Sequence, residues 1–158
     1  MNYLNLLWNL YQLKRNTGRG REDIKRLREK KLRKLLAYAY GHSTYYHRVF
    51  EEAGITGKQI ARMPLSAFPV LDKQLLMEHF DELVTVPDLK QEELRRFDAQ
   101  ESTDQKRFKD VYHVVHSSGS TGTPGYFVYD DAAWNQMLLG IIRAALWDMS
   151  MPQILRLL

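Results

Sequence analysis

The sequence contains no cysteine, so it has neither a disulfide framework nor a thiolate metal site, as is usual in a reducing cytoplasm. It also lacks an apolar run near the ~20 residues that a membrane-spanning helix requires. The most apolar stretch, residues 1–11, contains three asparagines, no basic residue precedes it and no small-residue cleavage site follows it. We therefore predict a soluble cytoplasmic protein with neither a signal peptide nor a membrane span.

Two catalytic signatures are also missing. The sequence has no Gly-x-Ser-x-Gly, which argues against a Ser–His–Asp hydrolase. It has no Walker A loop, because Gly119 and Gly122 are only three positions apart and no lysine follows Lys109. The acids between residues 86 and 110 have no histidine among them and no metal-ligand spacing, so we predict no metal site there. They are Glu92, Glu93, Asp98, Glu101 and Asp104.

The positive charge is concentrated in one segment. Residues 14–34 hold 11 of the 23 basic residues and three acids, whereas the whole chain has a net charge of only +4. Apolar residues with helical spacing run through the same segment, so a basic solvated face on an amphipathic helix explains both facts. Aromatic residues are absent between Tyr11 and Tyr38, which disfavours single-stranded nucleic acid as a partner. The apolar residues are Ile24, Leu27, Leu32, Leu35, Leu36 and Ala39.

The order of predicted elements indicates an α/β chain with a helical first half. We expect helices over residues 3–13, 22–41, 44–53, 73–82, 91–97 and 131–147. Ser43, Asp72 and Asp130 or Asp131 are the expected N-caps, and Gly41 is expected at a C′ position. The chain divides into a helical lead-in (1–85), a polar surface connection (86–110) and a strand–loop–strand–helix unit (111–158). The aromatics between Tyr38 and Phe50 are expected in the core rather than around a ligand.

The unit that starts at residue 111 contains a distinctive loop. A β-branched run, Val114-Val115, enters it and an aromatic and β-branched run, residues 126–129, leaves it, so the pattern predicts strand, loop, strand. Between the two runs stand serines, threonines, glycines and a proline without a bulky side chain. This composition is common in ordinary turns. The exposed N–H groups and hydroxyls of such a loop can also form a concave nest that binds an anion. The candidate phosphate-binding residues are Ser117, Ser118, Gly119, Ser120, Thr121, Gly122 and Thr123.

The order Ser118-Gly119-Ser120-Thr121-Gly122-Thr123-Pro124 resembles the phosphate-binding loop of the adenylate-forming superfamily, which includes the acyl-CoA synthetases. Upstream, residues 35–40 (Leu-Leu-Ala-Tyr-Ala-Tyr), residues 43–54 and residues 68–73 (Phe-Pro-Val-Leu-Asp-Lys) are similar to the lead-in of phenylacetate-CoA ligases. They are equally similar to relatives linked to coenzyme and capsular polysaccharide synthesis. Together these signatures cover most of residues 30–130.

The resemblance implies a two-step activation of a carboxylate substrate. The carboxylate attacks the α-phosphate of ATP to give an acyl-adenylate and pyrophosphate, and coenzyme A then displaces AMP. The loop would hold the β- and γ-phosphates while Mg²⁺ offsets their charge. The chain departs from the family at Thr123 and Gly125, where relatives often carry lysine. The family's later adenine, ribose and catalytic-lysine motifs are absent, so the resemblance implies the N-terminal part of the large domain, incomplete and inactive alone.

Histidines are the remaining acid–base candidates. His113 and His116 are three positions apart in a predicted strand, hence on opposite faces, so they are a poor metal pair. His116 precedes Ser117 and is a candidate loop neighbour, either touching a phosphate or bonding the loop backbone. His42, His47 and His79 show no partner pattern.

Two further functions stay open beside the ligase-like enzyme. One is a noncatalytic truncated product that binds a nucleotide or a partner subunit. The other is a basic helical scaffold on an anionic surface. In either case, apolar residues exposed by an incomplete core would favour self-association.

Overall fold

The computed structural model describes residues 3–99, 107–117, 124–145, 148–150, 152–153 and 156. The longer helices are α1 (Tyr3–Thr17), α2 (Arg21–His42), α3 (Thr44–Glu52), α6 (Gln91–Asp98) and α7 (Asp131–Ala145). The short ones are η1 (Leu65–Ala67), α4 (Lys73–Glu78) and α5 (Phe80–Leu83). The strands are β1 (His113–His116) and β2 (Tyr126–Tyr129). None of the helices in these ranges has the length and apolar character needed to cross a membrane.

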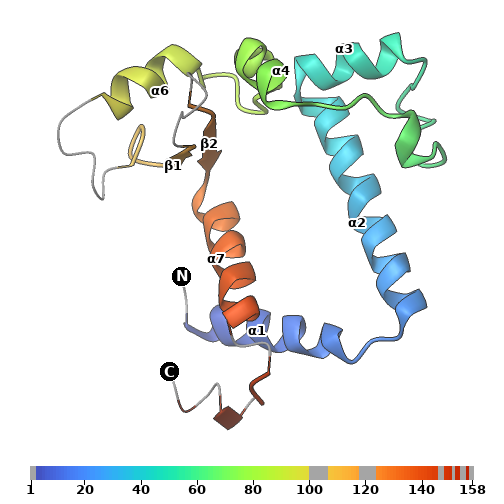
Figure 1. The fold of residues 1–158 in the computed structure, drawn as a ribbon, viewed down its shortest axis with the longest axis vertical. Coiled ribbons are helices and arrows are strands. Elements are labelled where there is room, and N and C mark those ends of the chain that lie inside the picture. Colours follow the sequence, from blue (N-terminus) through green and yellow to red (C-terminus); the bar gives the residue numbers. More distant parts are fainter. Residues whose placement is uncertain are drawn as a thin grey trace.

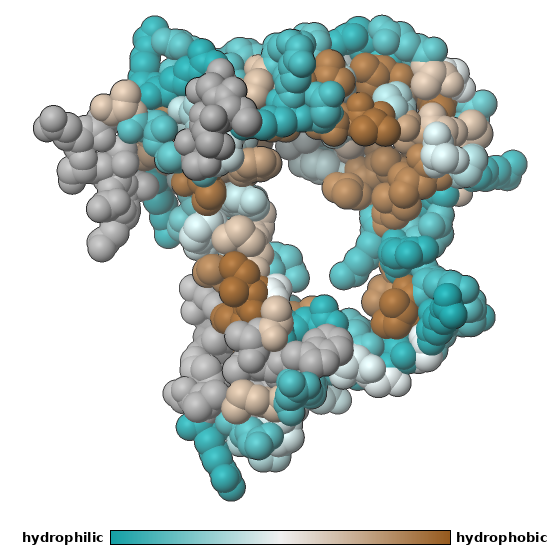
Figure 2. All heavy atoms as spheres, in the orientation of Figure 1, coloured by the Kyte–Doolittle hydropathy of each residue, from teal (hydrophilic) through white to brown (hydrophobic). Residues whose placement is uncertain are grey.

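The elements follow one another around a ring with an open centre (Figure 1). From α1 the chain rises through α2, crosses through α3 and α4 to α6 and the two strands, and descends through α7. The ring closes where α7 returns to α1, because Leu10 and Leu139 pack together there and are 5% and 2% exposed. The space-filling view shows an opening inside this ring (Figure 2). The molecule is therefore a helix-rich frame with a small sheet, an α/β composition in the general sense.

Three of the predicted N-caps are confirmed. The Ser43 side chain accepts a hydrogen bond from the backbone N–H of Tyr46 at the start of α3. Asp72 accepts from the N–H of Leu75 at the start of α4, and Asp130 accepts from the N–H of Ala133 at the start of α7. Each cap satisfies a backbone donor that the first turn of a helix leaves unpaired. The predicted break between α1 and α2 is also present, since α1 ends at Thr17 and α2 starts at Arg21.

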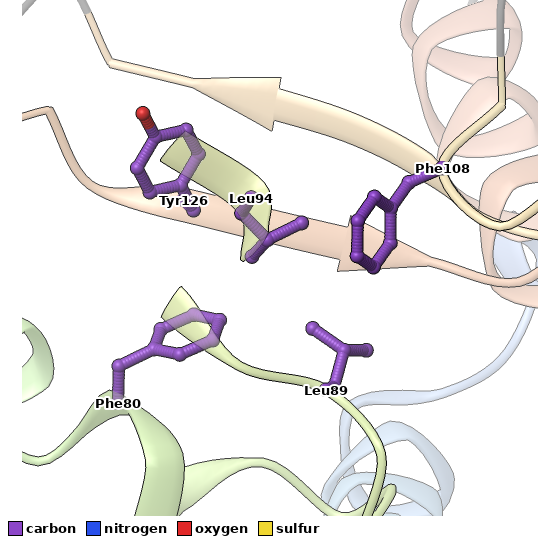
Figure 3. Close-up of a cluster of buried hydrophobic side chains, with 5 residues drawn as sticks. All are labelled: Phe80, Leu89, Leu94, Phe108 and Tyr126. Atoms are coloured by element: carbon purple, nitrogen blue, oxygen red, sulfur yellow. The ribbon is translucent and has the colours of Figure 1, made fainter. Parts of the chain in front are cut away.

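The largest buried cluster links the first half of the chain to the sheet (Figure 3). It consists of Phe80, Leu89, Leu94, Phe108 and Tyr126. Three of these residues belong to segment 86–110, which we expected to be a surface connection. That expectation is wrong for Leu89, Leu94 and Phe108, which are at most 5% exposed. The short helix predicted near residues 91–97 is present as α6, and Leu94 is its buried residue. The three-part division of the chain stays a prediction.

A second cluster lies around α3 and consists of Phe50, Ile55, Ile60 and Phe68. Tyr40 and Tyr46 pack against it, and Tyr45 is buried nearby, as expected for core aromatics. Tyr38 differs, because half of its surface is exposed. Gly54 turns the chain after α3 with a φ of 71°, a conformation that glycine adopts without strain.

Two helix predictions need correction. None of the α2 residues is fully buried, although Leu36 and Tyr40 pack against the second cluster, and Gly41 lies within α2 instead of at the predicted C′ position. For α7 the sequence predicts an apolar stripe of Trp134, Leu138, Ile141, Ile142 and Ala145. The buried residue is instead Leu139, and Ile141 is 60% exposed. This second error arises because helical spacing groups residues on one face but does not say which face meets a neighbour.

Candidate functional site

The serine-rich loop connects the two strands of the sheet, as predicted. The strands β1 and β2 pair in antiparallel fashion, and His113 lies opposite Tyr129 while His116 lies opposite Tyr126. Ser117 and Pro124-Gly125 therefore form the two ends of the loop. The six candidates Ser118, Gly119, Ser120, Thr121, Gly122 and Thr123 lie outside the described residues. The structure therefore describes the base of the loop, which consists of Ser117, Pro124 and Gly125.

Two hydrogen bonds close this base. The backbone N–H of Ser117 donates to the carbonyl oxygen of Gly125 at 3.0 Å, and the N–H of Gly125 donates to Oγ of Ser117 at 2.9 Å. The first bond extends the strand ladder by one pair, and the second uses the serine hydroxyl as an acceptor. Because Gly125 is buried, its N–H needs such a partner. Ser117 therefore has a structural role at the base, and its hydroxyl proton remains available to a ligand.

The base also packs against α4. A side-chain β-carbon at Gly125 would lie 3.8 Å from Cδ2 of Leu76 and from Sδ of Met77. Those are ordinary contact distances, so Gly125 is tightly surrounded but not forced to be glycine by its neighbours. Gly125, the last residue of the loop, therefore packs against α4 in the helical lead-in. Its hydrogen bonds with Ser117 fix the other end of the loop.

His116 and Asp98 extend the base on the other side. The two ring nitrogens of His116 each face an acceptor: Nε2 lies 3.4 Å from Oδ1 of Asp98, and Nδ1 lies 3.2 Å from the carbonyl oxygen of Ser117. A neutral imidazole has one N–H and can donate to one of these acceptors at a time, whereas a protonated ring can donate to both. Of the two contacts that the sequence left open for His116, the structure shows the one with the loop backbone, and the ring is half exposed. His116 therefore links Asp98 to the first residue of the loop.

Tyr126 completes the group. Its hydroxyl donates to Oδ2 of Asp98 at 3.2 Å, so one carboxylate contacts both the histidine and the tyrosine. Burial raises the pKa of Tyr126, and the negative charge of Asp98 and the hydrogen bond to it raise this pKa further. Tyr126 is thus a neutral hydroxyl at physiological pH. It holds the Asp98 carboxylate in place and does not serve as a base.

His113 belongs to a separate set of contacts. Its Nε2 lies 2.9 Å from Oδ1 of Asp131, its ring stacks on Trp134 with centroids 4.5 Å apart, and Arg107 contacts the same carboxylate. The hydrogen bond from His113, and then Arg107, lower the pKa of Asp131. These contacts fasten β1 to the start of α7. The prediction that His113 and His116 do not act as a pair is consistent with their different carboxylates.

The other histidines make local contacts. His42 and His47 face the backbone carbonyls of Tyr38 and Tyr40, and Nδ1 of His79 lies 3.0 Å from the Glu82 carboxylate. Within the described ranges no group of three or more histidines and acids is placed to hold a metal ion. Glu92, Glu93 and Asp98 of the acidic set lie on α6, and Glu101 and Asp104 fall outside those ranges.

Sequence reasoning found Ser117 and His116 but missed Asp98 and Tyr126. Asp98 was one of five acids in a polar segment, and nothing local connects it to a loop almost twenty residues later. Tyr126 was assigned to the strand that leaves the loop, without a polar role. Strand pairing could have indicated Tyr126, because the residue opposite His116 in the sheet contacts the same neighbouring groups.

No protein-family model matches the chain, and no curated protein sequence is significantly similar to it. The loop motif and its surroundings therefore carry the functional argument.

Proposed function

We propose that the chain supplies the phosphate-binding loop of an ATP-dependent, AMP-forming carboxylate–CoA ligase-like enzyme. The observation that carries the proposal is the sequence Ser118-Gly119-Ser120-Thr121-Gly122-Thr123-Pro124 between two paired strands. A loop held closed at its base presents its glycine N–H groups and hydroxyls at little entropic cost on binding. The bonds between Ser117 and Gly125 supply that closure.

In this function each group has a distinct part. The loop hydroxyls and N–H groups contact the β- and γ-phosphates of ATP, with Mg²⁺ as a counterion. His116 lies beside Ser117, the first residue of the loop, in a segment that lacks lysine. The later motifs for adenine, ribose and the catalytic lysine are not among these residues, so the chain alone binds triphosphate but does not form an acyl-adenylate. Binding of coenzyme A and of the carboxylate substrate requires those later motifs.

Calorimetric titration of the purified chain tests the phosphate-binding part. We expect MgATP and magnesium pyrophosphate to bind, and AMP, which lacks the β- and γ-phosphates, to bind at least tenfold more weakly. Thr121→Ala removes a hydroxyl donor to a charged phosphate, which costs about 1.5–3 kcal/mol, or roughly tenfold or more in affinity. Ser66→Ala, at an exposed serine in η1, is the matched control and leaves the affinity unchanged.

Equal binding of AMP and ATP, or equal effects of Thr121→Ala and Ser66→Ala, would contradict a triphosphate-binding loop. Release of pyrophosphate by the chain alone, given ATP and a carboxylate, would contradict only the claim that it is inactive by itself. The two parts of the proposal are therefore tested separately.

A further inference from the structure

The opening inside the ring has apolar walls. A cavity of about 390 Å³ lies at one end of it, and Tyr38 of α2 and Ala133 of α7 both line this cavity. The two helices therefore face each other across the same space. The rest of the lining is mostly apolar and includes Phe80, Leu83, Val84, Val86, Leu89 and Val128. Its polar members are Thr85, Tyr112 and Asp130, the N-cap of α7. Figure 2 shows hydrophobic surface on both sides of the opening.

The wall formed by α2 is apolar along most of the helix. Helical spacing places Ile24, Leu27 and Leu35 on the face of Tyr38, fourteen, eleven and three positions before it. Leu35 is 64% exposed, Tyr38 50% and Ile24 39%, and none of the α2 residues is buried. A helix that carries such a face normally buries it against another element. In the described residues this face stays largely exposed.

The wall formed by α7 is apolar and has small residues. Met137, Gly140, Ile141 and Ala144 lie on the face of Ala133, at four to eleven positions after it. Ile141 is 60% exposed, and a β-carbon added at Gly140 would have no atom within 4 Å. A neighbour could therefore approach the backbone of α7 closely.

The charge of the α2 wall is mostly positive. Lys31 lies within the apolar face, and Arg28, Lys34 and one acid, Asp23, lie beside it. The acids Glu22 and Glu29 point to the other side of α2, where they pair with Lys25 and Arg33. Among the described residues no acid pairs with Arg28, Lys31 or Lys34. An occupant of the opening thus meets apolar surface on two sides and unpaired cations on one.

We propose that the opening is the docking site of an apolar, acidic helix of a partner protein. A helix is required because both walls are helices, which have no free backbone groups to pair with a strand, and an enclosed segment must satisfy its own backbone. Apolar residues on opposite sides of that helix pack on α2 and α7, and acids face Arg28, Lys31 and Lys34. A flat bilayer fits poorly, since the apolar residues line the inside of the ring.

A display library of 20-residue helical peptides tests this. Its apolar positions are fixed as leucine or alanine, and its other positions vary among glutamate, glutamine and lysine. Peptides are selected on the intact chain and then titrated against two double variants. Leu35→Asp with Ile141→Asp changes both walls, and Leu65→Asp with Val70→Asp changes exposed apolar residues outside the opening. All four residues are more than half exposed, so both variants should fold, which circular dichroism and thermal melts verify.

We expect selected peptides to be enriched in glutamate, and to bind at least tenfold more weakly to the wall variant than to the control variant. Enrichment of lysine, or equal binding to both variants, overturns the proposal. If the chain self-associates and only the wall variant abolishes this, the opening binds a second copy of the chain instead. If the chain binds phosphatidylglycerol vesicles and only the wall variant abolishes this, the opening binds a membrane. Either result also overturns the proposal.

Discussion

His116 and Asp98 face each other at the base of the serine-rich loop, with Nε2 3.4 Å from Oδ1. The same carboxylate accepts a hydrogen bond from Tyr126, the cross-strand neighbour of His116. A charged group on α6 is thereby coupled to both strands that hold the loop. This coupling gives a direct spectroscopic test of the arrangement.

We predict that Asp98→Asn lowers the pKa of Tyr126 but leaves it above the ordinary value for tyrosine. Burial is the main cause of the raised pKa and does not change, whereas the charge of Asp98 and its acceptor strength are lost. The measurement is an NMR titration of the chain with ¹³C-labelled tyrosine, in which Tyr126→Phe identifies the signal. Glu92→Gln, which changes an α6 acid paired with Arg96, is the control. An unchanged Tyr126 titration in Asp98→Asn would show that this contact is absent in solution.

We predict that Ser117→Ala destabilises the chain by about 1–2 kcal/mol, because the buried N–H of Gly125 loses its acceptor. Ser117→Thr keeps the hydroxyl and should cost clearly less. Urea unfolding of both variants, with Ser66→Ala as the exposed control, measures the difference. If alanine and threonine are equally destabilising, the cost comes from packing and not from the hydrogen bond.

Features set by nearby residues could be predicted from the sequence. Ser43, Asp72 and Asp130 were found as caps because a cap bonds to a backbone N–H three positions later. The loop ends were found because strands and turn residues alternate over a few positions. For the candidate site, this local reasoning gave Ser117 and its neighbour His116.

Features set by distant contacts could not be predicted in this way. The buried positions of Leu89 and Phe108 depend on how α6 meets the sheet, and the contact between Asp98 and Tyr126 spans 28 positions. The uncovered face of α2 looks the same in sequence as a covered one. Leu139 of α7 is buried in a cluster with Leu10, which lies near the other end of the chain.

We predict that Leu94→Ala costs about 3 kcal/mol of unfolding free energy, since Leu94 is fully buried in the cluster that joins α6 to the sheet. Leu65→Ala makes the same chemical change at a residue that is 57% exposed, and should cost well under about 1 kcal/mol. Urea unfolding of both variants provides the comparison. Similar losses would contradict the burial of segment 86–110 and would support its original prediction as a surface connection.

We predict that the contacts of Asp131 stabilise the chain at neutral pH and are lost in acid. A carboxylate whose pKa is lowered on folding adds stability above its unfolded pKa, and this contribution disappears as the pH falls through the folded value. The difference in Tm between wild type and Asp131→Asn should therefore close as the pH falls below about 4, the ordinary pKa of aspartate. The exposed Asp88, changed to asparagine, is the control. A difference that is independent of pH would rule out the carboxylate charge as its cause.

We predict that Ser43→Ala costs about 2 kcal/mol, more than the loss of a typical exposed cap. The Ser43 hydroxyl accepts from the N–H of Tyr46 and donates to the carbonyl oxygen of Glu82 at 3.0 Å, and the residue is only 2% exposed. Alanine therefore leaves both a helix-terminal donor and a carbonyl on α5 without a partner. Urea unfolding beside Asp72→Ala, an exposed cap that serves one N–H, separates the two contributions. If both variants lose the same stability, the bond between Ser43 and Glu82 adds nothing to the packing of α3 on α5.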